Sequence, residues 1–347
     1  MKSIITRTVI AAAMMTSYSA QAAYKIDIDK KSSISFGGYI KVDSRLVSGD
    51  VAYKDFWTGN AKIEDTDKNQ FKIFANETRF NTKYINGDVT GFIEMDFLGG
   101  GGNQIVSNSS HPRIRHAFIA YKGFTVGQTW TTFMNTSAIP ETADFAGATV
   151  GLAFIRQGLL RYSKNGFQIA LENPETWGGD TSQESLPDLI ARYNIKGDWG
   201  NISLSALGRE LVSVSGIKNH AYGGSIAGKI NTWGKDDFKF QYHYGELGRY
   251  IGAGATKDMI GEEVEEVTSL LVAYRHFWTD TLRSNVIFGQ IETDITDIKR
   301  SQWGVNLFSD ITKSLSVGFE VGQFIIDQEN KDDANSVYAQ FSMRFAI

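Results

Sequence analysis

Charged residues that could bind or steer an ion recur at every second position in several stretches of the chain. Arg113 and Arg115 share one parity, and Glu94 and Asp96 share another in the stretch before them. Period-two spacing places such residues on one face of a β-strand. Arginine stays charged and offers a planar fork that can bind a carboxylate through two hydrogen bonds. The pattern therefore predicts strands whose polar face carries arginines suited to binding anions.

The candidate basic residues of this face are all arginines: Arg45, Arg79, Arg113, Arg115, Arg156 and Arg161. Rings of arginine or lysine favour anions when they line a pore. An alternative is that these arginines pair with Glu77, Glu94 and Asp96 and only hydrate the interior. Both interpretations stay open for each residue, and the group favours an anion-binding wall. Arg156 and Arg161 have opposite parity, so both can point inward only if a β-bulge intervenes.

The strands that must position these arginines are indicated by the alternation of apolar and polar residues along the sequence. Ile34, Phe36, Ile40 and Val42 fall on one face of the first such segment, and polar residues fall on the other. Segments of this kind recur along the chain and give about sixteen strands, an even number typical of bacterial outer-membrane barrels. The segments are 34–46, 71–84, 89–98, 113–121, 124–129, 155–162, 167–172, 188–196, 201–211, 221–230, 238–245, 267–275, 282–291, 300–309, 315–325 and 337–347. We therefore expect an all-β fold, a transmembrane antiparallel β-barrel.

The connections and the composition agree with this fold class. Tight turns such as 86–88 and 164–166 alternate with long polar stretches such as 99–112, 174–187 and 246–266, as short turns and long loops do in such barrels. The mean hydropathy is −0.23, so the apolar surface must be distributed by alternation. No cysteine is present, which excludes disulfides and thiolate metal sites. A soluble β-sandwich would show shorter strands.

The N-terminal residues have the features of a secretory signal. Lys2 and Arg7 precede a short apolar stretch, and Ala20 and Ala22 form a small-x-small cleavage pattern. We expect residues 1–22 to be a signal peptide and residues 23–347 to be the barrel. Lys and Arg total 35 against 39 Asp and Glu, and this acidic balance argues against nucleic acid as a partner.

One long connection is too apolar for a solvated loop. Residues 130–154 begin at Trp130, contain Glu141 and Asp144, and lack a strand period. Long connections inside a compact fold are usually functional, and a sixteen-strand barrel leaves a channel that wall side chains alone do not fill. We expect this segment to fold into the barrel as a constriction loop. Glu141 and Asp144 would then oppose the arginines across the pore. The alternative is a surface loop that packs on a neighbouring subunit.

The segment Gly127-Gln128-Thr129-Trp130-Thr131-Thr132-Phe133-Met134, with Pro140-Glu141 and Asp144-Phe145 after it, resembles the DcaP-type outer-membrane porins. Further similarity lies at 113–117, 156–157, 171–176 and 274–279. The resemblance implies a sixteen-strand homotrimeric porin in the outer membrane of a Gram-negative bacterium. It also implies uptake of small anions, dicarboxylates among them, and pore-wall roles for Arg113, Arg115 and Arg156. The periplasmic coiled coil of some members is not expected here.

Other functions receive less support from the sequence. An enzyme needs a nucleophile, a base and an orienting group at one site, and the five histidines are scattered with no serine motif beside them. We expect no enzyme activity, no cofactor and no metal. The expected partners are small anionic solutes, outer-membrane lipid and lipopolysaccharide. A non-selective general porin, or a receptor or adhesin that binds through the long loops, remains the alternative.

Overall fold

A computed structural model describes residues 24–51, 63–103, 105–144, 149–181, 183–328 and 333–347. The expected signal peptide lies outside these residues, and so do 145–148 of the expected constriction loop. Among the described residues, no helix is both long and apolar enough to span a membrane.

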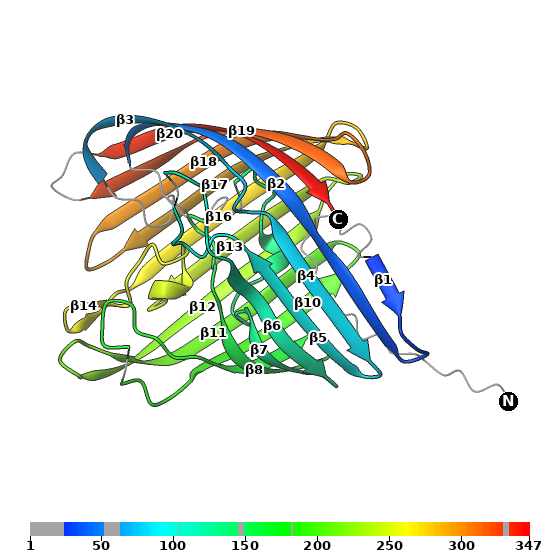
Figure 1. Ribbon diagram of the computed structural model, residues 1–347. Coiled ribbons are helices and arrows are strands. Elements are labelled where there is room, and N and C mark those ends of the chain that lie inside the picture. The colour runs from blue at the N-terminus through cyan, green and yellow to red at the C-terminus, as the bar shows by residue number, and fades with distance from the viewer. Residues whose placement is uncertain (1–23, 52–62, 104, 145–148, 182, 329–332) are drawn as a thin grey trace.

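The strands form a closed antiparallel barrel (Figure 1). The ring closes at β2 (Ser32–Val51), which pairs with β20 (Ala334–Ala346) on one edge and with β3 (Ile63–Phe74) and β4 (Arg79–Asn86) on the other. The strands between them are β5 (Val89–Asp96), β6 (Arg113–Tyr121), β7 (Phe124–Trp130), β8 (Arg156–Lys164), β9 (Phe167–Glu172), β10 (Asp188–Gly197), β11 (Gly200–Val212), β12 (Lys218–Asn231), β13 (Asp237–Gly245), β16 (Val267–Phe277), β17 (Leu282–Thr293), β18 (Ile298–Asp310) and β19 (Leu315–Gln328).

The barrel has 16 strands, which confirms the expected fold class. β3 and β4 both pair with β2 on the same edge and together form one spanning strand. The short β1 (Tyr24–Asp27) pairs with β2 beyond the end of β20 and extends that strand. The expectation of one unbroken strand over 71–84 was wrong. Residues 75–78 interrupt it because Glu77 and Thr78 turn inward to contact Lys41.

Apolar and polar side chains alternate along the strands as expected, with the apolar ones on the outer surface and the polar ones inside. On β2, Ile40 and Leu46 are 46% and 49% exposed on the outer surface, whereas Asp43 and Arg45 are 0% and 3% exposed inside. An apolar outer surface suits lipid, and polar residues face the lumen. Tight turns lie at one end of the barrel, where Asn165 and Gly166 both have positive φ, and β1 and the C-terminus lie at that same end (Figure 1).

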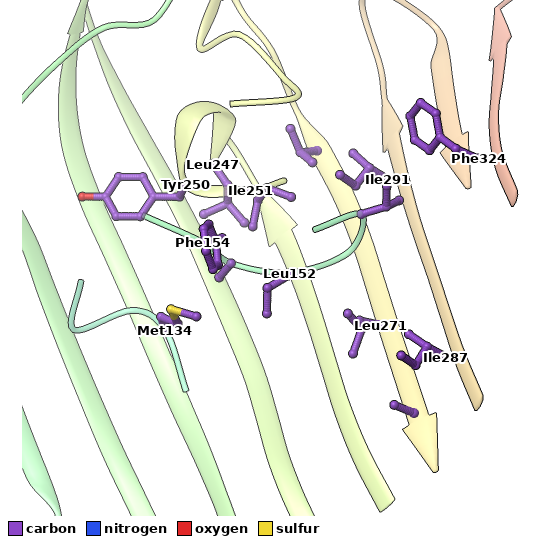
Figure 2. Packing of buried hydrophobic residues seen from close by; sticks show 14 of the residues in the cluster. Met134, Leu152, Phe154, Leu247, Tyr250, Ile251, Leu271, Ile287, Ile291 and Phe324 are labelled. Atoms are coloured by element: carbon purple, nitrogen blue, oxygen red, sulfur yellow. The ribbon is translucent and has the colours of Figure 1, made fainter. Parts of the chain in front are cut away.

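The barrel also contains an apolar cluster that the sequence did not predict. Its members come from the inner faces of several strands and from two connections, 131–155 and 246–266 (Figure 2). The second connection contains the 3-10 helix η2 (Gly248–Tyr250) and the small hairpin of β14 (Met259–Ile260) and β15 (Glu263–Val264). Phe133, Leu152, Tyr250 and Ile251 are almost fully buried in this cluster. Part of the lumen is therefore filled by packed protein.

Candidate pore constriction

The connection 131–155, called the constriction loop below, leaves β7 at Trp130 and runs along the inner surface of the barrel. Strands β10 to β13 bind its first half. The Asn135 side chain donates to Ser203 and to the Ala227 carbonyl, both at 3.0 Å. Gln241 donates to the carbonyl oxygen of Ala138 at 3.1 Å within the 3-10 helix η1 (Thr136–Ala138). The first half of the loop is thus attached to the inner surface of the wall, as expected for a segment folded into the lumen.

Glu141 attaches the middle of the loop to β17. Its carboxylate accepts two hydrogen bonds from Arg283, at 2.8 and 2.7 Å, and lies 3.6 Å from Arg275. Burial raises the pKa of this carboxyl, but the hydrogen bond and charge of Arg283 outweigh burial and hold the pKa below its ordinary value. Glu141 therefore stays ionised and serves as an anchor.

Asp144 and its neighbour attach the loop to the closure of the barrel. Asp144 forms a 2.8 Å salt bridge with Arg45. The carbonyl oxygen of Ala143 accepts hydrogen bonds from Lys41 and Gln340, at 2.8 and 2.9 Å. Both acidic residues of the loop are thus ion-paired with the wall behind it. This differs from the expectation that they would face the arginines across the pore. A buried carboxylate without a cationic partner is costly, and Arg283 and Arg45 provide that partner on the nearer wall.

The returning half of the loop packs backbone to backbone against β16 and β17. A Cβ atom on Gly289 would lie 1.9 Å from the Val150 carbonyl oxygen, and one on Gly151 would lie 2.0 Å from the Leu270 carbonyl oxygen. Glycine at these positions permits the close approach. The strands from β11 to β20, together with β2, form the anchor wall, which the loop covers.

The inner face of β4 to β10, called the arginine wall below, carries the other charged residues. Arg113 forms hydrogen bonds with both carboxylate oxygens of Asp96, and Arg115 contacts Glu94 and Asp96 at 2.7 and 2.9 Å. Arg113 and Arg115 therefore follow the alternative given above, in which the arginines pair with carboxylates of the lumen. A register shift in the β5–β6 pair, at Glu94, leaves Arg115 and His116 both buried.

Arg156 and Arg161 form no salt bridge with a carboxylate among the residues that the structure describes. The Arg156 guanidinium lies 4.5 Å from the centre of the Trp130 ring, and its Nη1 atom is buried with no hydrogen-bond partner. Its electrostatic neighbours are Arg115, Arg113, Arg79 and Asp96. The β7–β8 register is unbroken, so the bulge that would let both Arg156 and Arg161 point inward does not lie between them. Arg156 instead reaches the cluster from the first position of β8, where the chain leaves the constriction loop.

Arg79 and Arg161 complete the expected set. Arg79 lies over the Tyr39 ring at 5.2 Å and has Glu94, Asp96 and Glu77 as electrostatic neighbours. The Arg161 guanidinium donates a long hydrogen bond, 3.5 Å, to the Trp130 carbonyl oxygen. The structure therefore makes Arg79, Arg113 and Arg115 electrostatic neighbours of Arg156, with Arg115 and Arg156 over the Trp130 ring, and it places Arg45 in the anchor of the loop.

Sequence reasoning missed several charged residues of the lumen. Arg192 of β10 donates to the Met134 carbonyl oxygen and lies near Arg161, and Arg283 and Arg275 hold Glu141. Their inward parity on predicted strands was a usable signal. The inward course of connection 246–266 carried no comparable signal, because its acidic composition suggested an exposed loop. Among the described residues, no group of side chains could hold a metal ion.

A closed barrel with an apolar outer surface and a loop folded into its lumen defines an outer-membrane channel of the porin class. The family model for the DcaP outer membrane protein matches residues 17–303, and the chain belongs to that family. The family places the protein in the outer membrane of a Gram-negative bacterium and identifies a channel, not an enzyme, as the sequence indicated.

Solved structures support the same fold. The outer membrane channel DcaP of Acinetobacter baumannii is similar with a TM-score of 0.81 and 19% identity, covering 93% of this chain and 99% of that chain. An anion-selective porin from Comamonas acidovorans has a TM-score of 0.61 and 12% identity, covering 91% and 100%. A trimer form of OmpT from Vibrio cholerae has a TM-score of 0.56 and 12% identity, covering 91% and 100%. A search of curated sequences found no match.

Proposed function

We propose that this channel lets small hydrophilic solutes diffuse passively and prefers anions, with carboxylates and dicarboxylates as its main substrate class. The observation that carries the proposal is an excess of arginine over carboxylate on the arginine wall. Arg156, Arg161 and Arg192 form no salt bridge with a carboxylate within the described part of the chain. Arg156 lies over the Trp130 ring with Arg115 among its electrostatic neighbours, and Arg161 and Arg192 contact the Trp130 and Met134 carbonyl oxygens.

The surroundings of these arginines increase their effect on a permeating ion. Trp130 and Phe154 pack together with their ring centres 4.9 Å apart, and Arg156 lies on the Trp130 ring. A low-dielectric surface beside a charge strengthens its field and screens it less than water does. Arginine can also bind a carboxylate through two parallel hydrogen bonds. The wall thus offers a carboxylate solute both long-range attraction and specific contacts.

The carboxylates around the constriction are already ion-paired, and an excess of arginine favours anions in a pore. On the anchor wall, Glu141 and Asp144 are matched by Arg283 and Arg45. On the arginine wall, the carboxylates of Glu94 and Asp96 are already bound by Arg113 and Arg115. Arg156, Arg161 and Arg192 supply further positive charge and form no salt bridge among the described residues, although Asp96 is an electrostatic neighbour of Arg156 and Glu172 of Arg161.

Reversal potentials across a KCl gradient in planar bilayers test this proposal. We expect stepwise conductance and a reversal potential of anionic sign, and Arg156→Gln should shift it toward zero. Lys164→Gln on the same strand is the matched control, since Lys164 is exposed and lies at the turn end. A wild-type reversal potential of zero would favour the general-porin alternative. An absence of conductance steps would favour a receptor or adhesin.

Blockade of the current by added solutes identifies the substrate class. Dicarboxylates should reduce the open-channel current at lower concentration than monocarboxylates, because several arginines lie within one cluster. Equal blockade by neutral sugars of the same size would contradict a carboxylate preference.

We also propose that the chain forms homotrimers in contact with lipopolysaccharide. The support is the trimer form among the similar structures and the apolar outer surface of the barrel. Mass photometry of the detergent-extracted protein should give three times the mass of one chain, and a single-chain mass would contradict the trimer. Lipopolysaccharide should co-purify with the mild-detergent extract, and its absence would contradict that contact.

The division into a signal peptide, residues 1–22, and a barrel, residues 23–347, is likewise a proposal. The alternation of β2 starts soon after the expected cleavage point, which leaves room for removal without loss of a spanning strand. N-terminal sequencing of protein purified from outer membranes should begin at Ala23. A start at Met1 would contradict cleavage.

A further inference from the structure

The connection 246–266 between β13 and β16 is folded into the barrel and is joined to the constriction loop. The Phe154 amide donates to the Tyr250 carbonyl and the Gly252 amide donates to the Leu152 carbonyl, both at 2.9 Å. Ala153 and Ile251 are partners in an antiparallel bridge. Figure 2 shows Tyr250 and Ile251 beside Phe154 and Leu152, at the upper side of the apolar cluster. The two segments therefore pack as a single unit.

Tyr250 fixes this unit to the barrel wall. Its hydroxyl donates to Asp188 of β10 at 2.7 Å and accepts from Gln157 of β8 at 2.8 Å. The Arg209 and Arg249 guanidinium groups lie 5.2 and 5.1 Å from the centre of its ring. Tyr250 is fully buried. A buried hydroxyl with two partners between two cations specifies a single position for the loop.

Asp258 fixes the other end of the same loop. Its carboxylate binds the Arg209 guanidinium at 2.5 Å, the Arg249 amide at 3.0 Å and the Trp177 amide at 2.7 Å. Asp258 is 1% exposed. Arg209 also lies 3.6 Å from Asp188, so the contacts of Tyr250 and Asp258 meet on the β10–β11 wall. A loop designed only to be solvated would not require these buried charges.

We propose that the connection 246–266 is a second constriction loop, which clamps the first through Tyr250 and Asp258 so that the pair sets the width of the pore and keeps it open. The second loop holds the returning half of the first, 149–154, against β16 and β17. Without the clamp, that half is free to enter the remaining lumen beside the arginine wall. The clamp is independent of ion preference, because its charged groups, Asp188, Arg209, Arg249 and Asp258, are not among the main electrostatic neighbours of Arg156.

Single-channel recordings of Asp258→Asn and Tyr250→Phe test the clamp. Spontaneous closures should become at least about tenfold more frequent in Asp258→Asn, because a charged hydrogen-bond acceptor of buried groups is lost. Tyr250→Phe should show a smaller increase in the same direction. Glu262→Gln is the matched control on the same loop, since Glu262 is exposed and contacts Ser215. Closure rates equal to that of Glu262→Gln in both variants would overturn the proposal.

An engineered disulfide distinguishes a clamp from a general loss of folding. The chain has no cysteine of its own, and antiparallel bridge partners lie about 4.5–5.5 Å apart, within the range of a disulfide. Ala153→Cys with Ile251→Cys should oxidise with the wild-type conductance retained, and should return the closure rate of Asp258→Asn to within about twofold of wild type. Failure to oxidise in an assembled barrel, or unchanged closures after oxidation, would overturn the clamp. Reversal potentials should be the same in all these variants and the wild type. The clamp is therefore judged by closure rates, and the anion preference is judged by the reversal potential of the wild type.

Discussion

Arg283 and Arg156 project from opposite sides of one barrel, and their surroundings differ. Arg283 holds Glu141 in a two-pronged salt bridge and also contacts Asp310 at 2.9 Å. Arg156 has an aromatic ring and other arginines as neighbours, with Asp96 the one carboxylate among its main electrostatic partners. The same residue type therefore fixes a loop on the anchor wall and supplies, on the arginine wall, positive charge that forms no salt bridge among the described residues. Inward position alone does not give an arginine its role, since the role depends on whether a carboxylate has been placed beside it.

The largest expected effect is a loss of ion selectivity when arginines of the arginine wall are replaced. Replacing Arg156, Arg161 and Arg192 by Gln removes the cations that have no carboxylate partner in the described residues. We expect the anion-to-cation permeability ratio to fall by roughly fivefold or more, because the remaining charges of the wall are paired. Reversal potentials measure this ratio. An unchanged ratio would show that these side chains do not border the permeation path.

A second prediction tests the anchor wall. Arg283→Ala leaves the buried Glu141 with Arg275, at 3.6 Å, and Lys239 as its cationic neighbours and removes both close hydrogen bonds. Breaking a buried ion pair costs about 3–5 kcal/mol, so urea unfolding should move to lower urea. The reversal potential should change much less than in the triple variant of the arginine wall. A reversal-potential change as large as that of the triple variant, with urea unfolding unchanged, would contradict the anchor role of Arg283.

The pH dependence of the anchor provides a third test. Because the folded-state pKa of Glu141 lies below its ordinary value of 4.5, ionised Glu141 adds stability above that value. This contribution is lost as the pH falls through the lower, folded-state pKa. Unfolding free energy measured from pH 7 downward should therefore show an acid-dependent decrease below about 4.5 that is reduced in Glu141→Gln. Identical pH profiles for the two proteins would contradict the anchor role.

The smallest effect concerns the packing of the loop. Gly289→Ala places a Cβ atom against the Val150 carbonyl and should push the returning half of the constriction loop into the lumen. We expect a conductance reduced by roughly a third or less, because one methyl group displaces the backbone only slightly. Gly91→Ala is the control, since a Cβ atom there meets nothing within 4 Å. Equal conductance in both variants would show that the contact at Gly289 does not set the position of the loop.

Much of the barrel followed from sequence alone, since alternation records which face of each strand meets lipid. The expected strands at 113–121 and 167–172 match β6 and β9 to the residue. The break at 75–78 was not predictable, because Glu77 leaves the strand to reach Lys41 on a neighbouring segment. The inward parity of Arg113 and Arg115 was also readable, but their pairing with Asp96 and Glu94 depends on a register shift between two strands.

The sequence by itself determined the barrel, the order of its strands and the long apolar connection after Trp130, and it indicated some of the arginines of the inner face. Period-two patterns are local, and a membrane enforces them on every strand. Only the tertiary structure decided which arginines are neutralised, because Glu141 meets Arg283 and Asp144 meets Arg45 across 142 and 99 residues of chain. It also decided that a polar connection at 246–266 lies inside the barrel, since Tyr250 and Asp258 find their partners only once β10 and β11 are in place.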